Sequence, residues 1–313
     1  LRFGEFDVKS LSDHLEGTES LFGERFGSRS RFLEISDVGT VGLNGPLESI
    51  KRAEYGNLIK LVYSIGEKQQ GSGKGGSWGY GKTCYYTLGV GIVAYYSRTI
   101  VDGDFQERLI VALIEDTDHK DSMLFPDYDL GVSYWGEASK KSDLAIPVTD
   151  ESTISAFLNI FGTDRYEENE TGTKIIIPFV DENDLCKEMM DAIDLKNRTP
   201  DKTLFNNLIL LSVQRWYFPK IWNDHPDGDL RFFLDGKLLT GDDVTPLFKT
   251  LGKVFRDTFT DDSTEIVSRS DYLMESKVLA RYAYSEGKIA DLQIPFDTKL
   301  SVFLYASSSS SLN

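Results

Sequence analysis

Residues 31–46 read RFLEISDVGTVGLNGP and combine a β-strand with a glycine turn. The first part, RFLEIS, is rich in β-forming residues and predicts a strand. This strand runs directly into Asp37. The residues that follow are typical of a turn. Gly39 and Gly42 among them can take positive φ and let the backbone approach a ligand. The stretch therefore predicts a carboxylate held at the end of a strand, beside a glycine turn.

A second glycine-rich stretch, GSGKGGSWGYGKT, spans residues 71–83. Backbone N–H groups and a cation at the start of a helix both attract negative charge, so the stretch suits an anion such as phosphate. Its candidate contact residues are Gly76, Ser77, Trp78, Gly79, Tyr80, Gly81, Lys82 and Thr83. The two aromatic residues among them are more typical of packing against the core than of stacking on a base.

The sequence around these two stretches predicts further helices and strands. A helix is expected over 55–65, from the helical spacing of its apolar residues, and a short helix after Lys82. The runs GIVAYYSRTIV and RLIVALIED are expected to be neighbouring strands, because the turn text DGD separates them. The pair Gly172-Thr173 opens a predicted strand over 174–180.

Local signals predict three more elements. Residues 1–8 are expected to form a strand. A helix begins at residues 150–151, where acidic side chains suit the positive end of the helix dipole. The pair Asp235-Gly236 fits a type I′ turn between two alternating strands. Residues 118–146, by contrast, are polar and turn-rich and are expected to leave the core.

Composition restricts the class of protein. The chain has 313 residues, 40% of them apolar, and the linker-like text NRTPDKT near its middle favours two domains. A formal net charge of −16 argues against an indiscriminate grip on a polyanion over the whole surface. No run approaches the ~18 to 20 apolar residues that a membrane helix needs. The two cysteines favour a reduced compartment, so we expect a cytoplasmic protein without membrane contact.

Asp37 with its glycine turn, the segment 71–83 and the pair Gly172-Thr173, in this order, resemble the ATP-binding motifs of the gyrase B, heat-shock chaperone, histidine kinase and MutL class (GHKL). The resemblance covers roughly residues 1–200. It implies a Bergerat-type α/β (α+β) sandwich, in which a mixed sheet carries helices on one face, and it implies ATP and Mg²⁺ as cofactors. In that family the aspartate accepts the adenine amino group, the glycine-rich segment is a lid over the phosphates, and a Gly-Thr pair completes the adenine site.

Two features depart from the family pattern. The first motif usually reads Asp-x-Gly-x-Gly, whereas this chain has one more residue between Gly39 and Gly42. The family also carries a helix with a Glu that activates water and an Asn that holds Mg²⁺. No Glu-x-x-x-Asn precedes Asp37 here. That helix is expected upstream of Leu1, so neither a catalytic base nor a metal ligand is assigned.

Two other interpretations stay open. Residues 76–83 also satisfy the pattern G-x-x-x-x-G-K-[ST] of Walker-type NTPases, and LIVALIED at 109–116 imitates a Walker B strand. However, a Walker loop requires a buried strand that ends at its first glycine, and the preceding text GEKQQGSGKG is unsuited to one. Taken alone, the glycine-rich stretch also fits a surface loop. The three motifs in this order favour the GHKL interpretation.

The resemblance implies an ATPase that acts as a switch, in which ATP orders the lid, two copies dimerise, and hydrolysis releases them. The alternative is a scaffold that senses ATP without hydrolysing it. Residues 201–305 are predicted to form a smaller α/β transducer-like domain, in which Lys220, Lys237 or Lys249 would contact the γ-phosphate, and residues 306–313 a disordered tail. Expected partners are a second copy or a larger complex of an antiviral defence or DNA-processing system, and nucleic acid is a candidate partner that no feature of the sequence demonstrates.

Overall fold

The described part of the computed structural model comprises residues 1–15, 22, 26, 30–48, 55–64, 81–120, 123–125, 131–141, 145–195, 198–218, 220–221, 230–257, 267–274 and 277–285. Most of the predicted lid, residues 71–80, and the predicted tail, residues 306–313, lie outside it. The chain forms two compact units, Leu1–Asp181 and Glu182–Asn313. Residues 182–200, grouped with the ATP-binding domain on sequence, belong to the second unit in this division.

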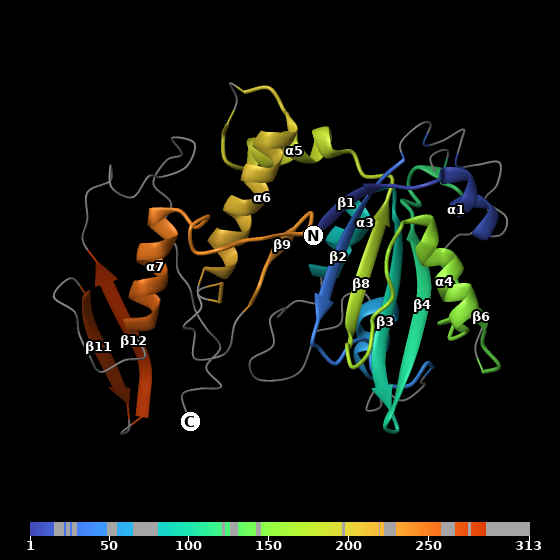
Figure 1. Ribbon diagram of the computed structural model, residues 1–313, viewed down its shortest axis with the longest axis horizontal. Coiled ribbons are helices and arrows are strands. Elements are labelled where there is room, and N and C mark those ends of the chain that lie inside the picture. The colour runs from blue at the N-terminus through green and yellow to red at the C-terminus, as the bar shows by residue number, and fades with distance from the viewer. Residues whose placement is uncertain are drawn as a thin grey trace. The chain divides into compact units, whose positions relative to one another are not determined.

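The first unit is built around a six-stranded sheet with the order β1-β2-β8-β3-β4-β5 (Figure 1). Its strands are β1 (Arg2–Glu5), β2 (Arg31–Val38), β3 (Ile92–Val101), β4 (Asp104–Ile114), β5 (Val132–Trp135) and β8 (Gly172–Pro178). Every neighbouring pair is antiparallel, so the α/β class is confirmed but the prediction of a mixed sheet is wrong. β3 and β4 are one of these pairs. They are joined by Asp102-Gly103, both with positive φ, and so short a connection returns the chain antiparallel.

Part of the segment predicted to leave the core belongs to this sheet. β5 pairs with the end of β4 and forms one edge of the sheet. β6 (Glu137–Ala138) and β7 (Ala145–Ile146) follow as a separate two-stranded ladder. The prediction for 118–146 is therefore wrong at β5. This strand has only four residues, all of them half-buried, and the polar text around it concealed it.

Two helices cover one face of the sheet. α1 (Val8–His14) packs against α4 (Glu151–Ile160), which lies over β4 (Figure 1). The apolar core of this face joins Leu11 and Phe157 of the helices to Tyr96 and other side chains of the central strands. This core fixes α1 and α4 to the sheet.

The start of α4 is where the sequence predicted it. Asp150 is its N-cap, and its carboxylate accepts a hydrogen bond from the backbone N of Thr153 at 2.8 Å. The hydroxyl of Ser152, followed by the bonds from Thr153, lowers the pKa of Asp150 to about 2. The local capping signal therefore defines the first turn of the helix.

Helical segments also cover the opposite face, so the prediction of helices on one face only is wrong. Side chains alternate along a strand, and Tyr95 therefore points away from the core that its neighbour Tyr96 joins. The hydroxyl of Tyr95 donates a hydrogen bond to that of Tyr86 in α3 (Cys84–Thr87) at 3.0 Å. The short helix predicted after Lys82 thus lies on the second face.

The helix predicted over 55–65 is shorter in the structure and has a π-helical part, η2 (Ile59–Tyr63). Its last residue, Tyr63, has its ring 5.1 Å from the ring of Tyr134 in β5. The neighbouring Trp135 packs against the core of the first face. Because adjacent strand residues point to opposite faces, η2 covers the same face as α3.

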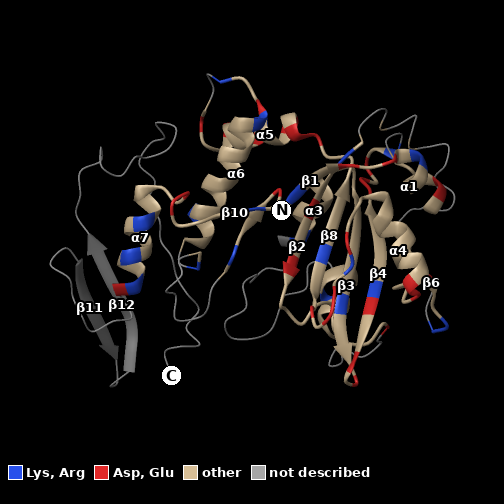
Figure 2. Ribbon diagram, in the orientation of Figure 1, with Lys and Arg blue, Asp and Glu red and all other residues tan. Residues whose placement is uncertain are grey.

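The second unit contains α5 (Glu182–Ala192), α6 (Lys202–Tyr217), β9 (Phe233–Leu234), β10 (Lys237–Leu238), α7 (Pro246–Asp257), β11 (Val267–Met274) and β12 (Lys277–Ser285). β9 and β10 form the predicted hairpin, and Asp235 and Gly236 at its turn both have positive φ. Phe248 of α7 packs with Phe218 and Val244 in a small core. Lys and Arg residues recur along α7 (Figure 2). No helix in the described residues of the chain is long and apolar enough to cross a membrane.

Candidate functional site

A row of polar side chains crosses the sheet on the face that η2 and α3 cover. Asp37 of β2 lies directly opposite Thr173 of β8. Thr173 is in turn opposite Ser97 of β3, which is opposite Arg108 of β4. Directly opposed residues point to the same face of a sheet, so the four side chains form one line. The last three are buried, and Asp37 at the end of the row is exposed.

The Asp37 carboxylate is held through one of its two oxygens. Oδ1 accepts a hydrogen bond from the Thr40 hydroxyl at 2.5 Å and another from the backbone N of Thr173 at 3.3 Å. Oδ2 accepts none from the part of the chain that the structure describes. The structure thus brings together Asp37 and Thr173, which lie 136 positions apart. It leaves one carboxylate oxygen available to a hydrogen-bond donor of a ligand.

Gly39 and Gly42 shape the turn that follows Asp37, with φ of +83° and +63°. The backbone N of Gly39 donates to the carbonyl oxygen of Thr171 at 2.8 Å. A Cβ on Gly42 would lie 2.6 Å from the carbonyl oxygen of Arg98, whereas a Cβ on Gly39 would meet open space. The turn therefore depends on glycine at both positions, for its backbone conformation and, at Gly42, also for space.

Two buried side chains that were not predicted from the sequence hold this turn. Oγ of Ser97 accepts a hydrogen bond from the backbone N of Leu43 at 2.8 Å and donates one to the carbonyl oxygen of Gly172 at 2.6 Å. Nη1 of Arg108 donates to the carbonyl oxygens of Leu43 and Gly45, at 2.8 and 2.7 Å. Together they tie the turn to β3 and β4.

Arg108 is 2% exposed, and within the described part of the chain its guanidinium has carbonyl and amide partners but no carboxylate. Burial lowers its pKa. A buried cation without a counter-ion is costly, and the hydrogen bonds to the turn are what offset that cost here. Nothing local in the sequence marks Arg108, because it opens the run RLIVALIED and resembles the polar end of a strand.

The pair Gly172-Thr173 is fixed by its neighbours. A Cβ on Gly172 would lie 2.2 Å from the carbonyl oxygen of Asp37, so β8 passes β2 here with no room for a side chain. Thr173 is 7% exposed, and its hydroxyl lies 3.5 Å from that of Ser97. Both predicted residues therefore stand at the Asp37 end of the polar row.

Of the predicted lid, Gly76, Ser77, Trp78, Gly79 and Tyr80 lie outside the described residues. Its last three residues form a 3-10 turn, η3 (Gly81–Thr83), that leads into α3.

Lys82, at the centre of η3, reaches the end of η2. Its ammonium donates to the carbonyl oxygen of Lys60 at 2.5 Å and to that of Ser64. The last carbonyls of a helix carry partial negative charge and attract a cation. Lys82 thus connects the base of the predicted lid to η2, which lies on the same face of the sheet as the polar row.

The other predicted contacts with ATP are less defined. Lys220, Lys237 and Lys249 all lie in the second unit, where Lys237 pairs with Asp243 at 3.3 Å. Among the described residues, no group of three or more His, Cys, Asp or Glu side chains could hold a metal ion. The Mg²⁺ ligands therefore stay a prediction without assigned residues.

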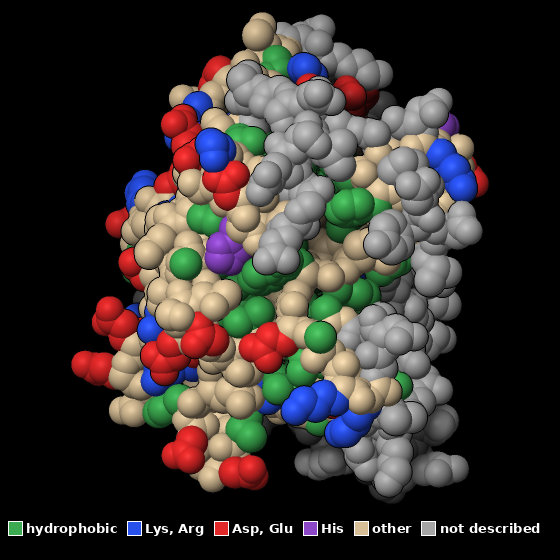
Figure 3. Space-filling view, turned by 90° about the vertical axis from the view of Figure 1, so that its right-hand side faces the viewer, with side chains coloured by type: hydrophobic (Ala, Val, Ile, Leu, Met, Phe, Trp, Pro, Cys, Tyr) green, Lys and Arg blue, Asp and Glu red, His purple; other side chains and the backbone are tan. Residues whose placement is uncertain are grey.

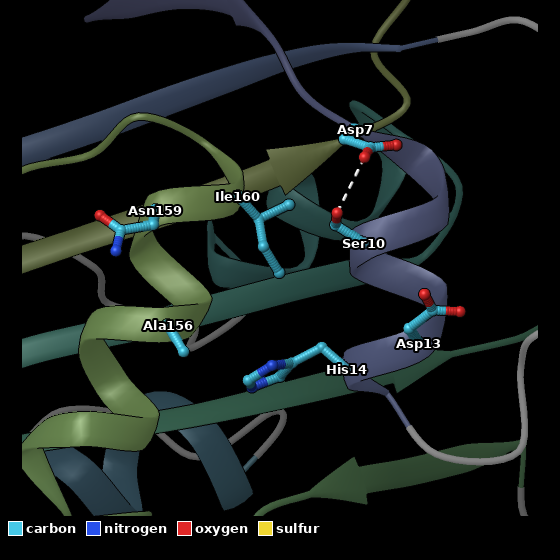
Figure 4. A pocket seen from close by; sticks show the side chains of 7 residues that line it. All are labelled: Asp7, Ser10, Asp13, His14, Ala156, Asn159 and Ile160. Atoms are coloured by element: carbon cyan, nitrogen blue, oxygen red, sulfur yellow. Dashed lines mark hydrogen bonds between the residues drawn. The ribbon is translucent and has the colours of Figure 1, made fainter.

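A pocket of about 490 Å³ lies between α1 and α4, on the face opposite the polar row. It is lined by Asp7, Ser10, Asp13, His14, Ala156, Asn159 and Ile160 (Figure 4). The described part of the face in Figure 3 carries acidic, basic and apolar side chains. None of the predicted site residues lines this pocket, so it is distinct from the Asp37 site.

His14 is the imidazole of this pocket, and its ring points from α1 toward Ala156 of α4 (Figure 4). The ring lies 5.1 Å from that of Trp135 and 5.4 Å from that of Phe157. Nε2 is buried, and no residue that the structure describes forms a hydrogen bond with it. Burial lowers the pKa of His14, so the neutral form is favoured in the folded protein.

Comparison of the chain with protein-family profiles, with curated proteins and with solved structures yields no significant match.

Proposed function

We propose that this chain binds ATP at the Asp37 site in the manner of GHKL proteins and hydrolyses it as part of a nucleotide-driven dimerisation switch. One observation carries the proposal. Asp37 with its glycine turn and the pair Gly172-Thr173, which resemble two of the three ATP-binding motifs of that family, meet at one point of the sheet. The Asp37 carboxylate keeps one oxygen available there.

The chemistry of that oxygen suits adenine. Adenine carries an amino group at position 6, a donor, where guanine carries a carbonyl oxygen, an acceptor. The Oδ2 atom of Asp37 can accept from the first and repels the second. The hydroxyl of Thr173, at the same end of the row, can reach the base through a water molecule. At Gly39 the turn has no side chain and borders open space, so its backbone is accessible to a ligand.

The antiparallel sheet weighs against the Walker-type alternative. A phosphate loop of that kind connects a strand to a helix in a βαβ unit with parallel strands. All neighbouring strands of the six-stranded sheet here are antiparallel, including β4, which contains most of the text that imitates a Walker B strand. The GHKL interpretation requires no such unit.

Lys82 gives the switch a physical element. Its ammonium is bound by carbonyl oxygens at the end of η2, and a triphosphate would offer it a stronger, charged acceptor. Exchange of one partner for the other would couple the phosphates to the position of residues 71–83. A ligand shifts a conformational equilibrium only through contacts that it makes in one state, and this exchange is such a contact.

The base site is tested by Asp37→Asn, which keeps the size of the side chain and removes its charge. Loss of the acceptor should weaken ATP by about 5-fold to 150-fold, the equivalent of 1–3 kcal/mol. The preference for ATP over GTP should also narrow, because an amide can donate to guanine. Asp104→Asn is the matched control, since Asp104 is an exposed carboxylate at the start of β4. The affinity for ATP is measured by titration calorimetry. An unchanged affinity in Asp37→Asn would contradict the assignment of Asp37 to the adenine site.

Hydrolysis is tested separately, by phosphate release at saturating ATP and rising protein concentration. A dimerisation switch should show a rate that rises more steeply than the protein concentration. Release no faster than in buffer alone, with ATP binding intact, would instead support the non-hydrolysing scaffold.

A further inference from the structure

Tyr166 reaches the main chain of Asp37 from a segment that was not predicted to belong to the site. It lies in the connection from α4 to β8, residues 161–171, and is 5% exposed. Its hydroxyl donates a hydrogen bond to the carbonyl oxygen of Asp37 at 2.5 Å. Burial, and then the nearby charge of Asp37, raise the pKa of Tyr166 well above its usual value. The hydroxyl therefore keeps its proton and acts as a donor.

The same connection holds the turn after Asp37 at two further points. The hydroxyl of Thr171 donates to the carbonyl oxygen of Thr40 at 2.5 Å. The carbonyl oxygen of Thr171 accepts from the backbone N of Gly39 at 2.8 Å. With the bond from Tyr166, three hydrogen bonds fix the main chain of residues 37–40 from this side.

Tyr166 is itself held by buried partners. Its ring stacks on that of Tyr96, with centroids 5.5 Å apart and planes 18° apart, and its backbone N donates to the Tyr96 hydroxyl at 3.0 Å. That hydroxyl donates to Glu107 at 2.7 Å, and Arg165 pairs with the other oxygen of Glu107 at 2.7 Å. The buried charge of Glu107 is thus compensated, and a compensated network has a defined geometry.

Glycine at position 172 leaves room for this arrangement. A Cβ there would lie 2.8 Å from the Tyr166 hydroxyl oxygen as well as 2.2 Å from the carbonyl oxygen of Asp37. A side chain on Gly172 would therefore push the donor and the acceptor apart. The close approach of β8 to β2 and the hydrogen bond from Tyr166 therefore both depend on the absence of a side chain at Gly172.

We propose that Tyr166 is a positioning residue that sets the selectivity of the Asp37 site for adenine over guanine. This rests on the function proposed above. A carboxylate oxygen distinguishes an amino group from a carbonyl group at the same place only if that oxygen is held at a defined point. Tyr166 fixes the main chain from which the carboxylate projects, and it does so without contacting the base.

The test is Tyr166→Phe, which removes the hydroxyl and keeps the stacked ring, with dissociation constants measured for ATP, adenosine and GTP. ATP and adenosine should both weaken by about fivefold, the effect of one hydrogen bond. GTP should change less, so that the ATP-to-GTP preference falls. Tyr63→Phe is the matched control, because the Tyr63 hydroxyl donates to the carbonyl oxygen of Ala145 at 2.7 Å, away from Asp37. Tyr63→Phe should keep the wild-type preference for ATP over GTP.

Three results would overturn the proposal, and they are distinguishable. Unchanged constants in Tyr166→Phe, with the preference lost in Asp37→Asn, would refute the positioning role and leave the proposed function standing. Equal weakening of ATP and GTP, with a lower free energy of unfolding, would make Tyr166 a purely structural residue. A wild-type protein that binds no ATP would remove the proposed function and the positioning role together.

Discussion

Asp37 and Thr173 lie directly opposite each other on β2 and β8, and the backbone N of Thr173 donates to Oδ1 of Asp37 at 3.3 Å. The relationship depends on the register of two strands that are distant in the sequence. A slip of one residue would turn Asp37 to the other face of the sheet, because side chains alternate. The site is therefore as sensitive to the packing of the sheet as to its own residues.

The two turn glycines should respond differently to alanine. Gly39→Ala incurs only the strain of a positive φ, about 1–2 kcal/mol, because its Cβ would meet open space. Gly42→Ala incurs a similar strain and also places a Cβ 2.6 Å from the carbonyl oxygen of Arg98. We expect the free energy of unfolding in urea to be lower for Gly42→Ala than for Gly39→Ala. Equal losses would mean that the turn adjusts freely.

Arg108 should be irreplaceable by lysine. Arg108→Lys keeps the charge but has no planar fork with which to hold the carbonyl oxygens of Leu43 and Gly45 together. One carbonyl left without its donor costs about 1–3 kcal/mol, so the variant should unfold at lower urea concentration. Its ATP affinity should fall as well, because the turn beside Asp37 loses its support. A variant as stable as the wild type would contradict this role.

Replacement of Lys82 should separate phosphate contact from base contact. Lys82→Met should weaken ATP by about tenfold or more, the effect of a charged hydrogen bond of 1.5–3 kcal/mol, and leave adenosine unchanged. Lys60→Met provides the control, because it removes a charge from η2 and keeps the carbonyl oxygen that Lys82 contacts. Equal weakening of ATP and adenosine in Lys82→Met would show that the lysine acts on the fold and meets no phosphate.

His14 should make the first unit sensitive to acid. Its pKa is lowered in the folded state, so the unfolded chain takes up the proton at the higher pH and protonation favours unfolding. The stability linked to His14 is present above the usual histidine pKa of about 6.5 and is lost as the pH falls through the lowered folded-state value. His14→Gln should flatten this slope in urea titrations between pH 5 and pH 8. His119→Gln is the control, because the His119 side chain is 75% exposed. This variant should keep the pH dependence of the wild-type stability.

Many individual elements could be predicted because their signals are local. The turn text at residues 102–104 predicted the β3–β4 hairpin, and Asp235-Gly236 predicted a second one. Asp150 marked the start of α4 through its capping chemistry. Short turns and helix caps are formed by residues a few positions apart. A short stretch of sequence is therefore enough to predict them.

The sheet itself was predicted incorrectly in its strand direction and in the faces that its helices cover. Both depend on which strands lie side by side. Strands that are distant in the sequence can be neighbours in the sheet, and the hydrophobic pattern within one strand does not show this. The same reason explains why Ser97, Arg108 and Tyr166 were missed. Ser97 and Arg108 lie within text that otherwise predicts ordinary strands, and Tyr166 lies in an acidic connection. Their partners at the turn are on other elements.

The sequence by itself determined which groups are present: a carboxylate at the end of a strand, glycines able to take positive φ, and a Gly-Thr pair that opens another strand. Only the tertiary structure decided that these groups meet, that one oxygen of Asp37 stays available, and that a tyrosine from a third segment holds its main chain. The physical reason is that residue types set what a side chain can donate or accept, whereas strand order and register set which side chains come within hydrogen-bond distance.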